Sequence, residues 1–491
     1  MIPVIDVFAG PGGLNEGFAR CNDGVTFSIA ASFEMEGNAV ETLKLRSAVR
    51  ALSKDGGVYK PYREALNRNA LLSARVASDV LRDDPCFQGA VAEADRHVFQ
   101  HELSEATRSE SDAVIRDRLP KSGEKWVLIG GPPCQAYSLV GRSRRTGEED
   151  FYEDVKHTLY REYLHIVKEF EPTVFVMENV KGLLSARTAK GDSGVSTLGL
   201  IIQDMKDLGY AVHSLVVEGA DPDHTDYVIR AEKFGVPQRR HRVILLGVRE
   251  DAELGAPKTL KALPQTATVE SVLMDLPEVR SLVSRGDDAS DWTQARSGAH
   301  AMVRKVLADR DLLERVQRPT GLPSTVASAY ASGATDSELM RWLRPAGLTH
   351  VTQHVPRSHM RSDLERYAFL AMLASVGKFP RVTELPEEMK PAHNNLKAKT
   401  VPFVDRFKVQ VRNRPSSTIA SHISKDGHYY IHYDASQMRS LTVREAARLQ
   451  TFPDDYYFMG NRTAQYHQVG NAVPPWLAKQ IAEVVADLLG E

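Results

Sequence analysis

The stretch Gly130-Gly131-Pro132-Pro133-Cys134-Gln135 follows the short apolar run Trp126-Val127-Leu128-Ile129, which predicts a buried strand. Two glycines and two prolines then turn the chain sharply. Open α/β sheets bind their ligands at the carboxyl ends of the strands. A lone cysteine is usually a small buried hydrophobe, but the place of Cys134 directly after this turn makes it a candidate nucleophile.

The composition is typical of a globular protein. The chain has 491 residues, of which 42% are hydrophobic and 26% charged, enough for a large core and about two or three domains. No run of roughly 18 apolar residues predicts a membrane span, and the N-terminus lacks the features of a signal peptide. Because 62 Lys and Arg nearly balance 64 Asp and Glu, a nucleic-acid partner would require the positive charge to gather in one cleft.

The small number of cysteines limits the kinds of site that the chain can form. The chain has three of them: Cys21, Cys86 and Cys134. This number excludes a disulfide framework and a cysteine-rich zinc site. It also indicates a reduced, cytoplasmic setting.

A second ligand-binding loop is predicted near the N-terminus. The strand expected over residues 2–8 runs into Ala9-Gly10-Pro11-Gly12-Gly13, where glycines let the backbone approach a ligand closely. Glu34 lies 21 residues past Gly13, where dinucleotide-type folds place the acid that binds ribose hydroxyls. A purely structural turn is the alternative. Together the loop and the acid predict a nucleoside cofactor, which need not carry phosphates because no Gly-Lys-Ser motif is present.

The βαβ pattern continues to about residue 250. An apolar strand expected over residues 173–177 ends at Glu178, and Arg240 and Arg242 precede another strand. The strand over residues 173–177 is expected to run parallel to the strand that precedes Cys134. The side chains of Glu178 and Cys134 should therefore face one cleft. Arginines ahead of a buried strand are usually a solvated strand end, which is the alternative for Arg240 and Arg242.

The pattern changes between residues 250 and 405, where polar loops replace the βαβ alternation. One segment there is basic and rich in histidine: Arg341, Arg344, His350, His354, Arg357, His359 and Arg361. No cysteine or acid completes a tetrahedral set with these histidines, so no metal site is predicted. Contact with phosphates or bases and a plain solvated surface remain the two alternatives.

Four motifs, in this order, resemble the DNA (cytosine-5) methyltransferase family. They are Pro132-Pro133-Cys134-Gln135, Glu178-Asn179-Val180, Gln238-Arg239-Arg240-His241-Arg242 and Gly470-Asn471-Ala472-Val473-Pro474-Pro475. The resemblance covers roughly residues 1–250 and 405–491. It implies a Rossmann-like α/β methyltransferase domain with a mostly parallel, doubly wound sheet, into which a smaller target-recognition domain is inserted.

The resemblance also implies the order of the domains along the chain. A catalytic domain is expected over 1–250, followed by a target-recognition domain over 251–435. A hinge over 436–467 and a C-terminal segment over 468–491 would then return the chain to the catalytic domain.

Other elements are predicted from the residues themselves. Residues 45–120 are longer than the family usually has here, and their Arg-, Ala- and Asp-rich composition with helical spacing predicts a helical insertion. Strands are expected over 27–33 and 211–217, and an amphipathic helix over 476–489. Thr442-Val443-Arg444-Glu445 predicts a capping box that opens a helix.

S-adenosylmethionine is the cofactor that the resemblance implies. Glu34 matches the family's ribose-binding acid, whereas Glu102 stands where the family has an aspartate against the adenine, which is a departure. The residues expected to bind the cofactor are Phe8, Ala9, Gly10, Pro11, Gly12, Gly13, Glu34, Met35, Glu102, Pro132, Asn471 and Ala472.

The implied reaction methylates carbon 5 of a cytosine flipped out of double-stranded DNA. Cys134 would attack carbon 6 of the ring, and Glu178 would act at ring nitrogen 3. Arg240 and Arg242 would polarise the ring carbonyl or position Glu178. The residues expected to contact DNA are Gln135, Ser138, Arg142, Arg144, Arg145, Gln238 and Thr418.

The family further implies a sequence-specific enzyme that acts as a monomer on DNA. Its expected role is to protect host DNA in a restriction-modification or phage-defence system, with a cognate nuclease as a candidate partner. Three alternatives stay open: a tRNA methyltransferase of the same superfamily, a catalytically silent DNA-binding subunit, and an unrelated Rossmann enzyme. The roughly 155 residues between Arg249 and Asp405 argue against the first, and the intact Cys134, Glu178 and Arg242 set against the second. The order of the four motifs argues against the third.

Overall fold

The computed structural model describes residues 1–491 except 54–56, 120–122, 133–155, 188–195, 220, 319–322, 326–327, 334–335 and 393–403. The chain forms two compact units. The first unit comprises Met1–Tyr62, Ser73–Gln265 and Ala472–Glu491, and the second comprises Arg63–Leu72 and Thr266–Asn471. The assignment of a catalytic role to one unit and a recognition role to the other stays a prediction.

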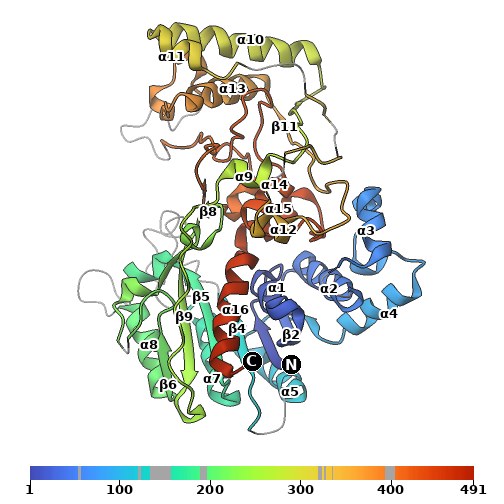
Figure 1. Ribbon diagram of the computed structural model, residues 1–491, viewed down its shortest axis with the longest axis vertical. Coiled ribbons are helices and arrows are strands. Elements are labelled where there is room, and N and C mark those ends of the chain that lie inside the picture. Colours follow the sequence, from blue (N-terminus) through green and yellow to red (C-terminus); the bar gives the residue numbers. More distant parts are fainter. Residues whose placement is uncertain are drawn as a thin grey trace. The chain divides into compact units, whose positions relative to one another are not determined.

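The first unit is built on a mostly parallel sheet (Figure 1). The strand order is β3-β2-β1-β4-β5-β9-β6, and β7 pairs with β9 as an eighth strand. Strands β1 to β5 pair in parallel, whereas β9 runs antiparallel to β5, β6 and β7. The strands of this sheet are β1 (Ile2–Val7), β2 (Phe27–Glu34), β3 (Val98–Gln100), β4 (Val127–Gly130), β5 (Val174–Val180), β6 (Tyr210–His213), β7 (Val228–Arg230) and β9 (His241–Arg249). The short strand β8 (Gln238–Arg239) is not part of it.

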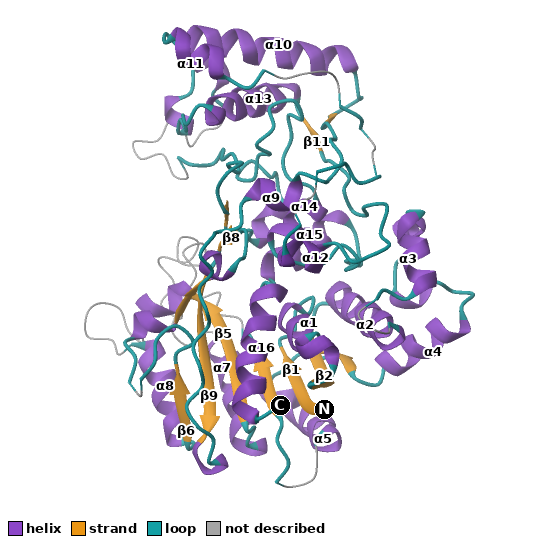
Figure 2. Ribbon diagram, viewed as in Figure 1, coloured by secondary structure: helices purple, strands orange, loops and turns teal. Residues whose placement is uncertain are grey.

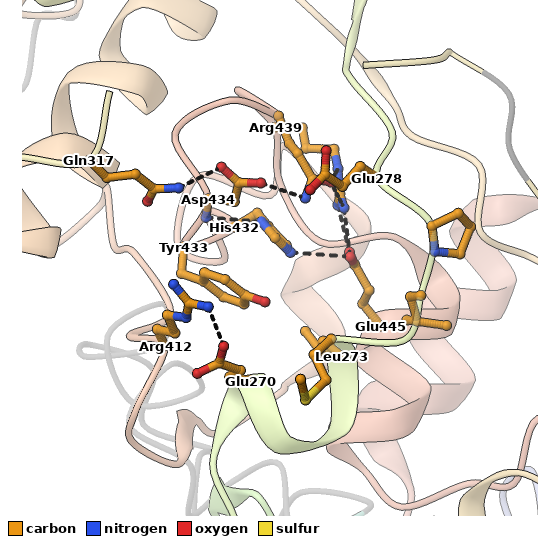
Figure 3. A pocket seen from close by; sticks show the side chains of 14 residues that line it. Glu270, Leu273, Glu278, Gln317, Arg412, His432, Tyr433, Asp434, Arg439 and Glu445 are labelled. Atoms are coloured by element: carbon orange, nitrogen blue, oxygen red, sulfur yellow. Dashed lines mark hydrogen bonds and ion pairs between the residues drawn. The ribbon is translucent and has the colours of Figure 1, made fainter. Parts of the chain in front are cut away.

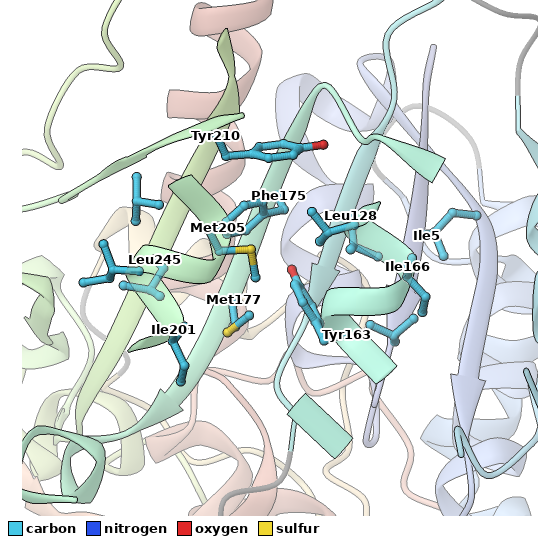
Figure 4. Close-up of a cluster of buried hydrophobic side chains, with 14 of the residues drawn as sticks. Ile5, Leu128, Tyr163, Ile166, Phe175, Met177, Ile201, Met205, Tyr210 and Leu245 are labelled. Carbon is cyan, nitrogen blue, oxygen red and sulfur yellow. The ribbon is translucent and has the colours of Figure 1, made fainter. Parts of the chain in front are cut away.

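Helices cover this sheet, and their apolar faces close a core on it (Figure 4). Tyr163 and Ile166 of α7 and Met205 of α8 pack with strand residues such as Phe175 and Leu128. Full burial of side chains of this size contributes roughly 1.5–3 kcal/mol each. The helices of the first unit are α1 (Gly13–Ala19), α2 (Gly37–Leu52), α4 (Pro85–Ala94), α5 (Arg108–Arg118), α7 (Lys156–Phe170), α8 (Thr197–Asp207) and α16 (Pro475–Leu489), while α3 (Lys60–Asn67) continues into the second unit.

The C-terminal helix α16 packs directly on α1, so the end of the chain completes the first unit. A Cβ atom at Gly17 would lie 2.4 Å from the Cβ of Ala478, and one at Gly13 would lie 2.1 Å from the carbonyl oxygen of Val473. Only glycine allows these backbones to come so close. The helix predicted over residues 476–489 is therefore present, and it lies against the N-terminal loop.

The region 45–120 differs from the purely helical insertion that its composition predicts. It contains the strand β3, which pairs in parallel with β2 in the main sheet, with Val98 opposite Ser32. A strand of three residues with one buried position is too short to show the alternation that identifies strands. The strand predicted over 211–217 also ends early, at His213.

The second unit consists mainly of helices and irregular loops (Figure 2). One of its cores surrounds α10 and α13, which contribute Trp292 and Tyr367. The capping box predicted at the start of α14 is confirmed: the Thr442 hydroxyl accepts from the Glu445 N–H at 3.2 Å, and the Glu445 carboxylate accepts from the Thr442 N–H at 2.7 Å. The elements are α9 (Val269–Leu273), β10 (Leu282–Val283), α10 (Ala289–Val306), α11 (Arg310–Arg315), α12 (Glu338–Leu343), β11 (Ser358–His359), α13 (Arg361–Ser375), β12 (Ser416–Ser417), α14 (Val443–Leu449) and α15 (Arg462–Asn471).

Buried ion pairs hold the loops of the second unit together. Arg448 is fully buried and pairs with Asp275 and, at 2.6 Å, with Asp454. Arg439 pairs with Glu445 at 2.6 Å, and both side chains are 1% exposed. None of the helices in the described parts of the chain has the length and apolar character needed to cross a membrane.

Candidate active site

The carboxyl ends of four neighbouring strands of the first unit meet at one edge of the sheet. In the parallel register, Val7 of β1 lies opposite Phe33 of β2 and Gly130 of β4, and Gly130 lies opposite Met177 of β5. The residues that follow these positions therefore lie along the same edge. They include Phe8, Glu34, Gly131 and Glu178, three of which are predicted site residues.

The loop after β1 has a backbone that suits a ligand-binding turn. Phe8 and Gly10 have positive φ angles of 54° and 56°, and Gly12 caps α1 in the left-handed region. The Ala9 N–H donates to the Phe33 carbonyl at 3.1 Å, and the Gly12 N–H donates to the Ala9 carbonyl at 3.0 Å. A Cβ atom at Gly10 would meet nothing within 4 Å, so open space adjoins the loop at this point.

Glu34 fastens this loop to the end of β2. One oxygen of its carboxylate accepts from the Gly10 N–H at 2.8 Å, and the other accepts from the Glu36 N–H at 2.8 Å. Burial raises the pKa of Glu34 above its usual value, while these backbone donors oppose the rise. Each carboxylate oxygen keeps a second lone pair, so the side chain can still accept from hydroxyl groups. The neighbouring Met35 is 61% exposed.

Asp6 is a functional candidate that the sequence analysis missed. It is the penultimate residue of β1 and is 1% exposed, and neither carboxylate oxygen accepts a hydrogen bond from the described residues. Burial raises the pKa of Asp6 to about 8, and the nearby charge of Glu34 adds to this effect, while Asn15 and Arg50 oppose it. The signal in the sequence was an acid inside an otherwise apolar strand.

The end of β5 carries the second group of candidates. The Glu178 carboxylate lies 2.7 Å from the Nε of Arg242, and the two side chains are 13% and 15% exposed. A Cβ atom at Gly131 would lie 2.9 Å from the Glu178 carboxylate, so the residue after β4 has to be small for this pair to form. The Asn179 amide donates to the Pro132 carbonyl at 3.3 Å and ties the turn after β4 to β5.

Arg240 and Gln238 precede β9 and are buried, at 2% and 0% exposure. Burial excludes the solvated strand end for Arg240, whereas the neighbouring Arg239 is exposed. Pro132 is the last described residue before the cysteine turn. The predicted site residues Cys134, Gln135, Ser138, Arg142, Arg144 and Arg145 lie outside the described residues.

The remaining predicted residues are distributed between the units. Ala472 is buried in the first unit, next to the segment that contacts Gly13. Glu102 is exposed and follows the end of β3, at the same edge as Glu34. Thr418 and Asn471 belong to the second unit. Among the described residues, no three His, Cys, Asp or Glu side chains gather as a metal site.

The first unit has the fold of a Rossmann-like methyltransferase. A crystal structure of a prophage-encoded protein assigned as a DNA modification methyltransferase (E. coli) shares this fold, with a TM-score of 0.53 at 20% identity over 100% of both chains. The chain belongs to the C-5 cytosine-specific DNA methylase family, whose model matches residues 97–487. It is therefore a DNA (cytosine-5-)-methyltransferase, as the four motifs predict.

Two relatives support this assignment. The Type II methyltransferase M.Bpa9945I of Bacillus paralicheniformis is 35% identical over 99% of this chain and 99% of its own. The Type II methyltransferase M1.HphI of Haemophilus parahaemolyticus is 27% identical over 80% of this chain and 75% of its own. The similarity to the first relative thus extends across both units.

We predict that Asp6 makes the stability of the protein fall as pH rises. With a pKa near 3.9 in the unfolded chain and about 8 in the folded one, Asp6 releases a proton on unfolding between these values. The free energy of unfolding of the wild type should then decrease by ~1 kcal/mol per pH unit relative to Asp6→Asn between pH 5 and about 8. Urea unfolding at several pH values measures this difference. The exposed Asp83→Asn is the matched control, and parallel pH profiles for wild type and Asp6→Asn would contradict the prediction.

Proposed function

We propose that the enzyme transfers a methyl group from S-adenosylmethionine to carbon 5 of a flipped-out cytosine in double-stranded DNA, through a covalent adduct on Cys134. The observation that carries this proposal is the Glu178–Arg242 pair at the carboxyl edge of the sheet, beside the turn that leads to Cys134. An acid held by an arginine next to a thiol provides the groups that activation of a cytosine ring requires.

The residues of the N-terminal loop fit the cofactor. Glu34 has acceptor capacity for ribose hydroxyls, and open space adjoins Gly10. The carboxylate oxygens of buried Asp6 accept no hydrogen bond from the described residues, and a positively charged cofactor nearby would lower its raised pKa and favour the carboxylate form. When bound, S-adenosylmethionine supplies an electrophilic methyl group on a sulfonium centre. Phe8, Ala9, Pro11, Gly12 and Gly13 would form the rest of the cradle.

The chain's own side chains would then activate the base. The Cys134 thiolate adds to carbon 6, and the electron pair of the 5,6 double bond becomes available at carbon 5. Glu178 donates a proton to ring nitrogen 3 and so neutralises the charge that develops there. Arg242 fixes the orientation of Glu178 and, with Arg240, polarises the ring carbonyl. After methylation, a base removes the proton from carbon 5, the 5,6 double bond re-forms, and the bond between carbon 6 and the Cys134 sulfur breaks. Ring nitrogen 3 returns its proton to Glu178 in this step.

The target cytosine must leave the duplex before the catalytic side chains can reach it. Flipping costs a few kcal/mol, which contacts to the displaced strand and the backbone can offset. Gln135, Ser138, Arg142, Arg144 and Arg145 after the cysteine turn are our candidates for these contacts, with Gln238 and Thr418. Phosphate contacts carry no sequence information, so sequence specificity requires contacts to base edges in the major groove. We assign these base contacts to the second unit.

The biological role we propose is modification of host DNA in a restriction-modification or phage-defence system. The support is the name of the relatives, both of which are Type II methyltransferases. A cognate nuclease is then an expected partner.

We expect the wild type to transfer tritiated methyl groups from S-adenosylmethionine to duplex DNA of mixed sequence and not to total tRNA. Cys134→Ser should lose at least about a thousandfold in rate, because a hydroxyl is a far weaker nucleophile than a thiolate. The control is Cys86→Ser, which changes an exposed cysteine of α4. Bisulfite sequencing of the product locates the modified cytosines. Label in tRNA alone, or full activity of Cys134→Ser, would contradict the proposal.

Glu178→Gln should lower turnover by about 10²- to 10⁴-fold, the range of general acid–base catalysis, with little change in cofactor affinity. The amide keeps the shape of the side chain but cannot donate the proton. Single-turnover methylation measures the rate, and calorimetry measures cofactor binding. Glu124→Gln, at an exposed position before β4, is the matched control. A loss of cofactor affinity with unchanged turnover would move Glu178 to the cofactor site.

Glu34→Gln should weaken S-adenosylmethionine binding by about 10-fold or more, since a charged acceptor contributes roughly 1.5–3 kcal/mol to hydrogen bonds. Calorimetry without DNA measures this effect independently of catalysis. The control variant is Glu36→Gln, which removes an acid two residues away from Glu34. The glutamine that replaces Glu36 still offers an oxygen to the Ala39 N–H at the start of α2. Equal affinities of the two variants would exclude a ribose-binding role for Glu34.

A further inference from the structure

The second unit contains a cavity of about 370 Å³ that is lined by cations. Arg357 lies in its wall, and Lys425 and Arg462 contribute exposed side chains from two other segments. Hydroxyl groups of Ser358 and Thr463 also line it. Arg357 belongs to the basic segment for which the sequence left phosphate contact and plain surface as alternatives.

Arg357 is held rigidly but keeps unused capacity to donate. Its guanidinium donates to the carbonyls of Lys425 and Ile423 and lies 4.2 Å from the centre of the Tyr466 ring. The residue is 6% exposed, and its Nε is buried without a hydrogen-bond partner in the described part of the chain. Its charge still adds to the positive potential of the cavity that Arg357 lines.

The positive charge of the cavity is not neutralised by its own wall. Within the described residues, Arg357, Lys425 and Arg462 form no ion pair with a carboxylate. The two acids at the wall have other cationic partners: Asp363 pairs with Arg366, and Asp426 pairs with Arg406 at 3.3 Å.

The two histidines of the wall add little charge at neutral pH. Burial lowers the pKa of His359 to about 3, with the nearby Arg357 contributing, and burial also lowers the pKa of His428. The excess positive charge therefore comes from the arginines and the lysine.

Two helix N-termini add to this field. Met360 precedes α13, and no side chain caps that helix. Arg462 and Thr463 form the first turn of α15, and both line the cavity, as does Met360. The Asn461 side chain accepts from the Ala464 N–H at 3.0 Å, so the start of α15 is partly capped whereas that of α13 is not. Helix N-termini carry partial positive charge and present free N–H groups, an arrangement that binds phosphate.

Another cavity of the second unit, of about 250 Å³, shows the opposite arrangement (Figure 3). Its charged groups face one another: Arg412 pairs with Glu270, Arg439 pairs with Glu445 at 2.6 Å, and Gln317 donates to Asp434 at 2.9 Å. No excess of positive charge remains there for an anion. Of these two cavities, the one lined by Arg357 is the better candidate for binding an anion.

We propose that the cavity formed by Arg357, Lys425 and Arg462 binds a phosphate of the DNA backbone and so fixes the register of the second unit on its substrate. The proposal rests on the proposed function for the identity of the polyanion. The same chemistry would accept free phosphate, so the experiment separates these two sources.

The test compares two double variants that remove equal charge from the second unit. Lys425→Gln/Arg462→Gln changes the exposed cations of the cavity and leaves the buried Arg357 in place. Lys378→Gln/Arg304→Gln changes two exposed cations that do not line it. Fluorescence anisotropy measures affinity for a labelled duplex of mixed sequence at several salt concentrations, and calorimetry measures binding of inorganic phosphate.

We expect the cavity variant to bind duplex about tenfold more weakly than the control variant. Its log K against log salt should also have a slope shallower by about 0.9, the value for one lost phosphate contact. Duplex affinity equal to that of the control overturns the proposal. Loss of inorganic phosphate binding with unchanged duplex affinity overturns the DNA assignment in favour of a free anion. Methyl transfer by the wild type is measured in parallel. If the wild type methylates DNA and the two variants bind duplex with equal affinity, only the phosphate-site proposal is refuted. If the wild type transfers no methyl group, the proposed function is refuted.

Discussion

The antiparallel pairing of β5 with β9 is the constraint on which the candidate active site depends. It places Arg242 opposite Val180, the last residue of β5, where its guanidinium reaches Glu178 at 2.7 Å. A shift of the register by one residue would turn Arg242 to the other face of the sheet. Glu178 would then be a largely buried carboxylate without a cation, which is strongly destabilising. The position of β9 in the sheet therefore fixes the position and the direction of this carboxyl group.

The second unit is specified by a different kind of interaction. Its loops are joined by buried arginines, such as Arg448, which links Asp275 near α9 to Asp454 after α14. Burial of two charges costs nearly as much free energy as their pairing returns. We therefore interpret this network as selecting one arrangement of irregular segments, while the apolar contacts around α10 and α13 supply the stability. The first unit needs fewer such pairs because the hydrogen bonds of its sheet already fix the register.

The sequence predicted what local patterns determine. Apolar runs identified β1, β2, β4 and β5, and the Thr442–Glu445 capping box identified α14. It missed β3 because three residues show no period, and it missed Asp6 because the burial of that carboxyl depends on strands far apart in the chain. The histidines of the basic segment were ambiguous for the same reason. His354 is buried because its ring bonds to Thr442 and to the Pro277 carbonyl, 88 and 77 residues away. The cysteine turn itself was predicted from motif alone.

Net charge is a weak guide to the partner of this protein, and the structure shows why. The chain carries a formal charge of −2. The charge at any one surface depends on which ionised side chains lack an opposite partner there, and not on the total number of each kind. Deeply buried acids of the second unit, such as Asp275, Asp454 and Glu445, are neutralised inside it by Arg448 and Arg439. Such acids are counted in the composition but contribute little to the field outside. The cations without a carboxylate partner then dominate where they gather, as around Arg357. A nearly neutral sequence can thus present a positive surface to a polyanion.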